Sequence, residues 1–370
     1  MSIENQAPDY IRVIAPYQGG RPIAEIARLY GFTEDSIVKL ASNENPLGMS
    51  PRARQAMLDA SADLGRYPDG NGHDLKLAIS RRFDLPMDWI TLGNGSNDIL
   101  EAAAAVTLNP QASCVYSQHS FAVYALAPQA RGAQAIVVPA RDYGHDLAAM
   151  AAAIRPHTRL VFIANPNNPT GTFLPAPALA AFLAQMPRAV VVVLDEAYNE
   201  YLPPELRYDS VAWVRQHPNL IVSRSFSKAY GLAALRVGYG VMDATVADLL
   251  NRVRQPFNVN SLAQAAAAAA LDDADYLARS YALNREGLRT LTAGFDRLGL
   301  DYVPPFGNFV LVKVGPAARV YQELLRRGVI VRPVANYGLP EWLRVTVGLE
   351  AENARFLDVL PPALAAAQAQ

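Results

Sequence analysis

Two short apolar runs constrain the fold of this chain most strongly. Residues 160–164 (LVFIA) and 189–194 (AVVVVL) are almost entirely apolar, and the helix-forming segment 176–185 lies between them. Such runs are typical of parallel strands that are buried on both faces. A strand–helix–strand rhythm favours right-handed crossovers and ligands at the carboxyl ends of the strands. The sequence therefore predicts an α/β fold in which helices flank a mostly parallel sheet.

The length of the chain predicts more than one domain. Its 370 residues exceed the usual length of a domain built around one hydrophobic core. We expect an N-terminal arm with a short helix in residues 1–35, a large domain in 36–255 and a small α+β domain in 256–370. The last boundary is set where PFNVN (256–260) interrupts the pattern, just before an alanine-rich helix that begins at Ser261.

The composition excludes several classes of protein. Hydrophobic residues make up 51% and charged residues 18%, and the net charge of −1 gives no global attraction for nucleic acid or an anionic membrane. The five histidines are scattered, which argues against a catalytic metal held by the protein. The single cysteine, Cys114, suits a reducing compartment, and residues 1–10 do not resemble a signal peptide. We expect a cytoplasmic protein without membrane or nucleic-acid partners.

One lysine stands at the end of a predicted strand. Residues 220–222 are apolar, and the following SRSFSKAYG (223–231) surrounds Lys228 with small hydroxyl residues. Arg224 and Arg236 are near enough in sequence that we expect both to lower the pKa of this lysine, as would partial burial. A neutral amine can form a Schiff base with a carbonyl cofactor. Taken alone, the same pattern could be a surface lysine in a loop.

A second constellation points to the same chemistry. Asp195 follows the buried run 190–194, where a carboxylate requires a cation, and a protonated pyridine nitrogen is one such cation. Tyr198 and an amide from NPNNPTG (165–171) could reach an oxygen on the same ring. Asp195 could instead cap a helix, and the Asn-Pro turn could be plain loop. Their order before Lys228 favours the shared site.

A glycine turn in the first half of the chain predicts a phosphate site. GNGSND (93–98) lies between a predicted strand, residues 89–92, and a predicted helix, residues 99–106. Backbone N–H groups at such a helix start bind phosphate. The third glycine of a dinucleotide fingerprint is missing and no suitable acid follows. The turn therefore favours a cofactor monophosphate over a nucleotide.

These motifs together carry a family resemblance over nearly the whole chain. NPNNPTG (165–171), DEAY (195–198) and SFSKAYGL (225–232) resemble the fold-type-I pyridoxal-phosphate aminotransferases. KLASNENPLG (39–48) and RYPD (66–69) are similar to the histidinol-phosphate aminotransferase family. The resemblance implies the fold-type-I architecture, with a large domain and a small C-terminal α+β domain.

The resemblance also implies how pyridoxal 5′-phosphate would be held. Lys228 would form the Schiff base and shuttle a proton between the substrate α-carbon and C4′ of the cofactor. Asp195 would pair with the ring nitrogen, while Tyr198 and Asn168 would bind the ring oxygen. Phe121 would stack on the ring, where many members have tyrosine. The phosphate would be bound by Gly95, Ser96, Asn97, Ser225, Ser227 and Arg236.

Substrate and partner contacts are implied in the same way. Arg344 would clamp the substrate carboxylate bidentately. Arg332 and the partner subunit's Tyr17 would bind the other anionic group of the substrate, with Asn168 nearby. Tyr67 would reach the phosphate from the neighbouring subunit, so the resemblance implies a homodimer.

The implied reaction is transamination between L-histidinol phosphate and 2-oxoglutarate in histidine biosynthesis. An aromatic amino-acid aminotransferase and a pyridoxal-phosphate decarboxylase of an amino-acid phosphate would share Lys228. An aminotransferase-like sensor module is disfavoured because the sequence contains no helix-turn-helix segment. A nicotinamide dehydrogenase is disfavoured because the glycine turn is incomplete. The sequence leaves the preferred amino donor open.

Overall fold

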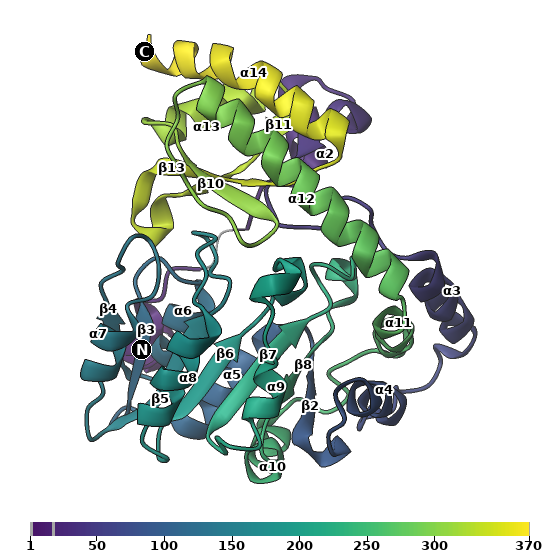
Figure 1. Cartoon of the computed structure of the whole chain (residues 1–370), viewed down its shortest axis with the longest axis vertical. Helices are drawn as coiled ribbons and strands as arrows, with labels where there is room; N and C mark the ends of the chain where they lie inside the picture. The colour runs from purple at the N-terminus through teal and green to yellow at the C-terminus, as the bar shows by residue number, and fades with distance from the viewer. Residues whose placement is uncertain (1–2, 17–18, 370) are drawn as a thin grey trace.

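A seven-stranded sheet forms the centre of the larger part of the computed structural model, which describes residues 3–16 and 19–369 (Figure 1). β8 runs antiparallel to both of its neighbours, and the remaining neighbouring pairs are parallel. The predicted, mostly parallel sheet is confirmed. In spatial order, the strands are β2 (Ile90–Gly93), β8 (Gly238–Val241), β7 (Leu220–Ser225), β6 (Val191–Asp195), β5 (Thr158–Ala164), β3 (Ser113–Ser117) and β4 (Gln134–Val138).

Both faces of this sheet are covered, which explains the continuous apolar runs. Along β5, Leu160 and Phe162 pack into one core cluster while Val161 and Ile163 pack into another. The first cluster includes residues of α5, α6 and α10, and the second includes residues of α4, α8 and α11. The helices of this part are α3 (Pro51–Ala60), α4 (His73–Phe83), α5 (Ser96–Thr107), α6 (Val123–Gln129), α7 (Leu147–Ala152), α8 (Ala176–Gln185), α9 (Ser210–Trp213), α10 (Ala244–Val253) and α11 (Ser261–Leu271).

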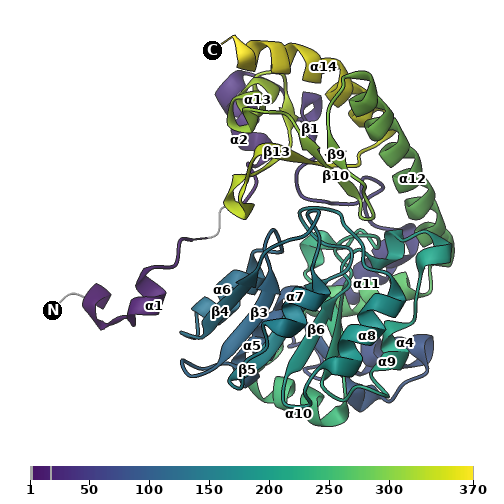
Figure 2. The same ribbon diagram turned by 60° about the vertical axis from the view of Figure 1, so that its left-hand side comes forward.

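A smaller α+β layer lies above the sheet in Figure 1. Its four-stranded antiparallel sheet has the order β12 (Arg332–Val334), β13 (Leu339–Thr346), β10 (Phe309–Lys313) and β9 (Tyr302–Val303). The long helix α12 (Ala274–Arg297) reaches down from this layer to the large part, as Figures 1 and 2 show. The layer is completed by α13 (Ala317–Leu325) and α14 (Glu350–Gln368).

The packing assigns two segments differently from the predicted domain bounds. β1 (Val38–Lys39) pairs in parallel with β11 (Val329–Ile330), and α2 (Ile23–Tyr30) packs beside it, so both belong with the small layer. α11 packs against α3 and α4 instead of joining the C-terminal part. The division into 36–255 and 256–370 stays a prediction, and this packing favours a boundary after α11.

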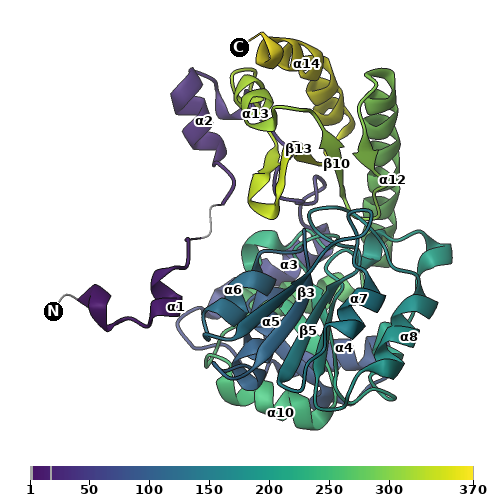
Figure 3. The ribbon, with the colours of Figure 1, turned by 90° about the vertical axis from the view of Figure 1, so that its left-hand side faces the viewer.

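The N-terminal arm leads away from the body of the molecule. Residues 3–16, with the short helix α1 (Asp9–Arg12), extend outward in Figures 2 and 3. Ile3 and Val13 in this arm are 86% and 71% exposed. In the described part of the chain, no helix combines the length and apolar character needed to cross a bilayer.

Candidate active site

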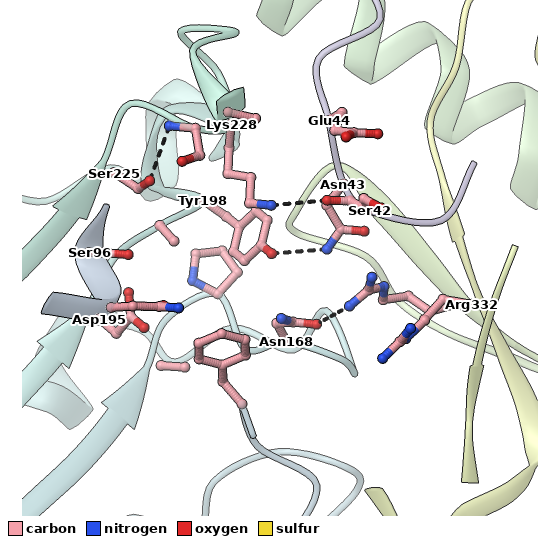
Figure 4. Close-up of a pocket in the computed structure, with 18 of the residues that line it drawn as sticks. Ser42, Asn43, Glu44, Ser96, Asn168, Asp195, Tyr198, Ser225, Lys228 and Arg332 are labelled. Atoms are coloured by element: carbon pink, nitrogen blue, oxygen red, sulfur yellow. Dashed lines mark hydrogen bonds between the residues drawn. The ribbon is translucent and has the colours of Figure 1, made fainter. Parts of the chain in front are cut away.

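A cavity of about 280 Å³ opens between the two layers at the carboxyl ends of β5, β6 and β7. Figure 4 shows side chains from both layers converging on it. A second cavity of about 730 Å³ adjoins the first and shares Gly20, Phe121, Arg332 and Tyr337 with it. The first cavity thus lies at the strand edge where the predicted fold would bind a ligand.

Lys228 follows β7 and points its amine into this cavity (Figure 4). Its Nζ donates a hydrogen bond to the Ser42 carbonyl oxygen at 3.0 Å. Burial, together with the positive charges of Arg344 and Arg236, lowers the pKa of Lys228 to about 8. The expected role of Arg224 is wrong, because its guanidinium pairs with Glu196 at 2.9 Å. An appreciable fraction of the lysine is therefore neutral near neutral pH.

Asp195 ends β6 and has one carboxylate oxygen without a partner. Its Oδ2 accepts a hydrogen bond from the Tyr124 hydroxyl at 2.7 Å, whereas Oδ1 is buried and has no partner among the described residues. Burial raises the pKa of Asp195 to about 6, while the bond from Tyr124 opposes that shift. A buried acceptor of this kind calls for a donor, and none of the described residues supplies one.

Tyr198 and Asn168 lie on neighbouring parts of the cavity wall (Figure 4). The Tyr198 oxygen accepts a hydrogen bond from Asn43 Nδ2 at 2.9 Å, and burial raises the pKa of its phenol to about 12. Asn168 Oδ1 accepts from Arg344 Nη1 at 2.5 Å, and Arg344 Nη2 donates to the Ala41 carbonyl at 2.7 Å. Two protein acceptors therefore orient the buried guanidinium toward the cavity.

An anion cradle forms where α5 begins. Ser96 and Asn97 line the cavity, and Arg236 Nη1 donates to Ser227 Oγ at 3.2 Å. Gly95 has φ of +79°, and a Cβ there would lie 2.3 Å from Arg236 Nη2. Backbone N–H groups, a guanidinium and hydroxyls thus converge at one end of the cavity, a combination that suits a phosphate.

The chain matches the family model for aminotransferase class I and II over residues 35–360. It is 64% identical over 366 residues to histidinol-phosphate aminotransferase 2 of Ralstonia nicotianae, covering 98% of each chain. It is 62% identical over 354 residues to the histidinol-phosphate aminotransferase of Methylobacillus flagellatus, covering 96% of each. The chain belongs to the histidinol-phosphate aminotransferase family.

A solved structure agrees with this assignment to the histidinol-phosphate aminotransferase family. The Sinorhizobium meliloti histidinol-phosphate aminotransferase in complex with pyridoxal-5′-phosphate has a TM-score of 0.90 to this chain. It is 28% identical in sequence, and the match covers 98% of each chain. The fold-type-I architecture implied by the sequence is therefore confirmed.

The structure brings most of the predicted site residues of this family member together. The predicted site residues that line the cavity are Ser96, Asn97, Phe121, Asn168, Asp195, Tyr198, Ser225, Ser227, Lys228, Arg236, Arg332 and Arg344. Gly95 packs against the guanidinium of Arg236, which lines the cavity. Tyr67 does not line this cavity: it is 81% exposed and stacks on Phe257 with ring centroids 4.6 Å apart. Tyr17 lies outside the described residues.

The sequence did not predict the residues that hydrogen-bond to the site residues and hold them in place. Tyr124, Asn43 and Ser42 hold Asp195, Tyr198 and Lys228 respectively. Tyr124 lies three residues after Phe121, a spacing that places both side chains near one face of a helical turn. Asn43 and Ser42 belong to the segment 39–48 that carried the family resemblance, but their contacts are with residues far along the chain.

Proposed function

We propose that this chain transfers an amino group between L-histidinol phosphate and 2-oxoglutarate, yielding imidazole-acetol phosphate and L-glutamate in histidine biosynthesis. The observation that carries the proposal is the 64% identity to a histidinol-phosphate aminotransferase over 98% of both chains. The cavity supports it, because an amine, a buried carboxylate and three arginines converge there.

The cavity fits pyridoxal phosphate as the cofactor. The unpartnered Oδ1 of Asp195 is an acceptor for a protonated ring nitrogen, and Phe121 offers an aromatic face. Ser225, Ser227 and Arg236, with the turn at Gly95, Ser96 and Asn97, supply donors for the phosphate. When bound, pyridoxal phosphate supplies an aldehyde that condenses with amines and a ring that accepts electron density from the substrate α-carbon.

Within this proposal, Lys228 transfers the proton, and other residues of the cavity bind the cofactor ring. Lys228 removes the proton from the substrate α-carbon, and its lowered pKa leaves it partly neutral for that task. Asp195, kept ionised with help from Tyr124, holds the ring nitrogen protonated. Tyr198 and Asn168 bind the ring oxygen.

Arginines select the substrates in this proposal. Arg344 is buried, and its planar fork suits a carboxylate of glutamate or the phosphate ester of histidinol phosphate. Arg332 lines both cavities and so stands between the reacting centre and the larger adjoining space. Tyr17 of the partner subunit would add a hydroxyl to the same anion.

A homodimer completes the proposed site. Tyr67 is 81% exposed and does not line the cavity of its own chain, which leaves it available to a neighbouring subunit. The exposed apolar residues Ile3, Ile11 and Val13 of the arm are also suited to contact with a second copy. We propose a cytoplasmic homodimer.

The test is a half-reaction with purified protein saturated with pyridoxal phosphate. Histidinol phosphate, phenylalanine and glutamate are added separately, and conversion of the cofactor to its amine form is followed by absorbance. We expect kcat/KM for histidinol phosphate to exceed that for phenylalanine at least about 100-fold. Equal values would make the protein an aromatic aminotransferase. Release of CO₂ from an amino-acid phosphate, tested in a separate assay, would make it a decarboxylase.

A further inference from the structure

Asn43 is buried at the junction of the two layers and touches both. It is 1% exposed and lies in the segment that leads from β1 into the large part. Its backbone N–H donates to Thr346 Oγ1 of β13 at 3.0 Å, and its carbonyl accepts from Asn308 Nδ2 at 3.0 Å. Its side chain lies between Thr346 on one side and Tyr198 on the other, as Figure 4 shows for Tyr198.

The hydrogen bonds between Asn43 and Thr346 determine the orientation of the Asn43 amide. Because the Asn43 backbone N–H donates to Thr346 Oγ1, the Thr346 hydroxyl keeps its own proton for another acceptor. Asn43 Oδ1 is that acceptor, at 3.1 Å. If the amide were reversed, the buried Thr346 proton would have no acceptor among the described residues. Nδ2 must then face Tyr198, and an amide nitrogen can only donate.

The orientation of the amide in turn determines what Tyr198 can do. Its oxygen already accepts the bond from Asn43 Nδ2 at 2.9 Å, and this is its one hydrogen-bond partner in the described part of the chain. The phenol stays protonated at neutral pH because burial raises its pKa to about 12. Its proton is therefore available to an acceptor in the cavity.

We propose that Asn43, held by Thr346, is a positioning residue that makes Tyr198 a hydrogen-bond donor to the cofactor ring oxygen. The inference rests on the proposed function, since that oxygen belongs to pyridoxal phosphate. Thr346 is two residues from Arg344 on the same strand. The strand that carries the substrate-binding arginine thus also sets the direction of the bond that Tyr198 makes.

The test compares the effect of Tyr198→Phe in two backgrounds. The readout is the pH midpoint of the absorbance change of the bound cofactor. A donor to the ring oxygen stabilises negative charge there, so its loss makes that oxygen more basic and raises the midpoint. In the native background we expect Tyr198→Phe to raise the midpoint by about one pH unit.

Asn43→Asp is the second background, because a carboxylate can only accept and draws the Tyr198 proton toward residue 43. Aspartate also tolerates the φ of +55° found there. In that background we expect Tyr198→Phe to move the midpoint by less than about a third of its native effect. Any direct influence of the added charge cancels, because it is present with and without the Tyr198 hydroxyl.

Thr346→Val and Thr346→Ser test the same inference without a substitution at residue 43. Thr346→Val removes the hydroxyl that orients the amide and should reduce the effect of Tyr198→Phe, whereas Thr346→Ser should preserve it. An equal effect in every background, or no effect in the native one, would overturn the inference. A native protein that binds no pyridoxal phosphate would instead refute the proposed function and, with it, this inference.

Discussion

Tyr124 donates a 2.7 Å hydrogen bond to Asp195 Oδ2, and the other oxygen of that carboxylate is buried without a hydrogen-bond partner among the described residues. The tyrosine is itself fixed by stacking on Phe162, with ring centroids 4.7 Å apart. One oxygen of Asp195 is thereby held in place while Oδ1 remains for a ligand. The phenol also favours the ionised carboxylate, which burial alone would disfavour.

Removing that phenol should make cofactor binding more sensitive to acid. Asp195 has a pKa of about 6, so its charge, and with it the affinity for pyridoxal phosphate, is lost as pH falls through that value. In Tyr124→Phe we expect the midpoint to move upward by about one pH unit, because a bond that lowers the pKa is gone. Cofactor affinity measured between pH 5 and 8 checks this. Tyr116→Phe, which has no bond to Asp195, should leave the midpoint unchanged.

Attachment of the cofactor should follow the ionisation of Lys228. Because the pKa of this lysine is lowered to about 8, the rate at which cofactor-free protein combines with pyridoxal phosphate should rise about tenfold per pH unit below 8 and level off above it. Stopped-flow absorbance measures the rate. A rate that still climbs between pH 9 and 10 would indicate an ordinary lysine. After borohydride reduction, Lys228→Ala should lack the cofactor mass found on the native peptide.

Arg344→Lys should weaken the binding of anionic substrates even though the positive charge is kept. The guanidinium is oriented by Asn168 Oδ1 and the Ala41 carbonyl, and a lysine has no planar fork to replace it. We expect kcat/KM for histidinol phosphate to fall about 10- to 100-fold, mainly through KM. Histidinol, the same amine without the phosphate, serves as the control substrate. An equal loss with histidinol would mean that Arg344 does not bind the anion.

Gly95→Ala should weaken the binding of pyridoxal phosphate, because the added Cβ displaces Arg236. A Cβ at residue 95 would lie 2.3 Å from Arg236 Nη2. We expect dissociation of pyridoxal phosphate to quicken about tenfold or more, as a charge-assisted bond to the phosphate is lost. Gly299→Ala is the matched control, because its φ of +66° imposes similar backbone strain where nothing lies within 4 Å. Equal dissociation rates in the two variants would contradict the role of Gly95.

The Arg224–Glu196 pair should matter for stability. Both side chains are buried, and Arg224 Nε and Nη2 donate to Glu196 Oε2 at 3.0 and 2.9 Å. Arg224→Met leaves a buried carboxylate without its cation, so the free energy of unfolding should fall by about 3–5 kcal/mol. Urea unfolding of cofactor-free protein measures this. Arg289→Met, which breaks the exposed pair with Glu286, should cost less than about 1 kcal/mol.

Local patterns predicted the elements of this fold well. The helix-forming segment 176–185 has the bounds that the structure gives to α8, and the strand expected at residues 89–92 overlaps β2. Gly31 ends α2 in the left-handed conformation that favours glycine, with φ of +73°. Apolar periodicity and glycine caps are properties of neighbouring residues, so the sequence displays them directly. The lysine loop and Asp195 could be found for the same reason.

Contacts between distant residues could not be predicted in this way. Tyr124 and Asp195 are 71 positions apart, and Asn43 and Tyr198 are 155 apart. Proximity in sequence also misled the interpretation of Arg224. This side chain on β7 pairs with Glu196, which follows β6, and Arg224 is not among the charges that shift the pKa of Lys228. Such partners depend on strand register and on which face a side chain takes.

The pairing of β1 with β11 has a consequence for synthesis. Val38 and Lys39 are translated 291 residues before their partners Val329 and Ile330. The central sheet can form once β8 has been translated, whereas the loop with Ser42 and Asn43 must wait for the small layer. We therefore expect a nascent chain to reach a folded, ligand-incompetent stage first, and to gain its binding pocket only after β11 and β13 have been translated.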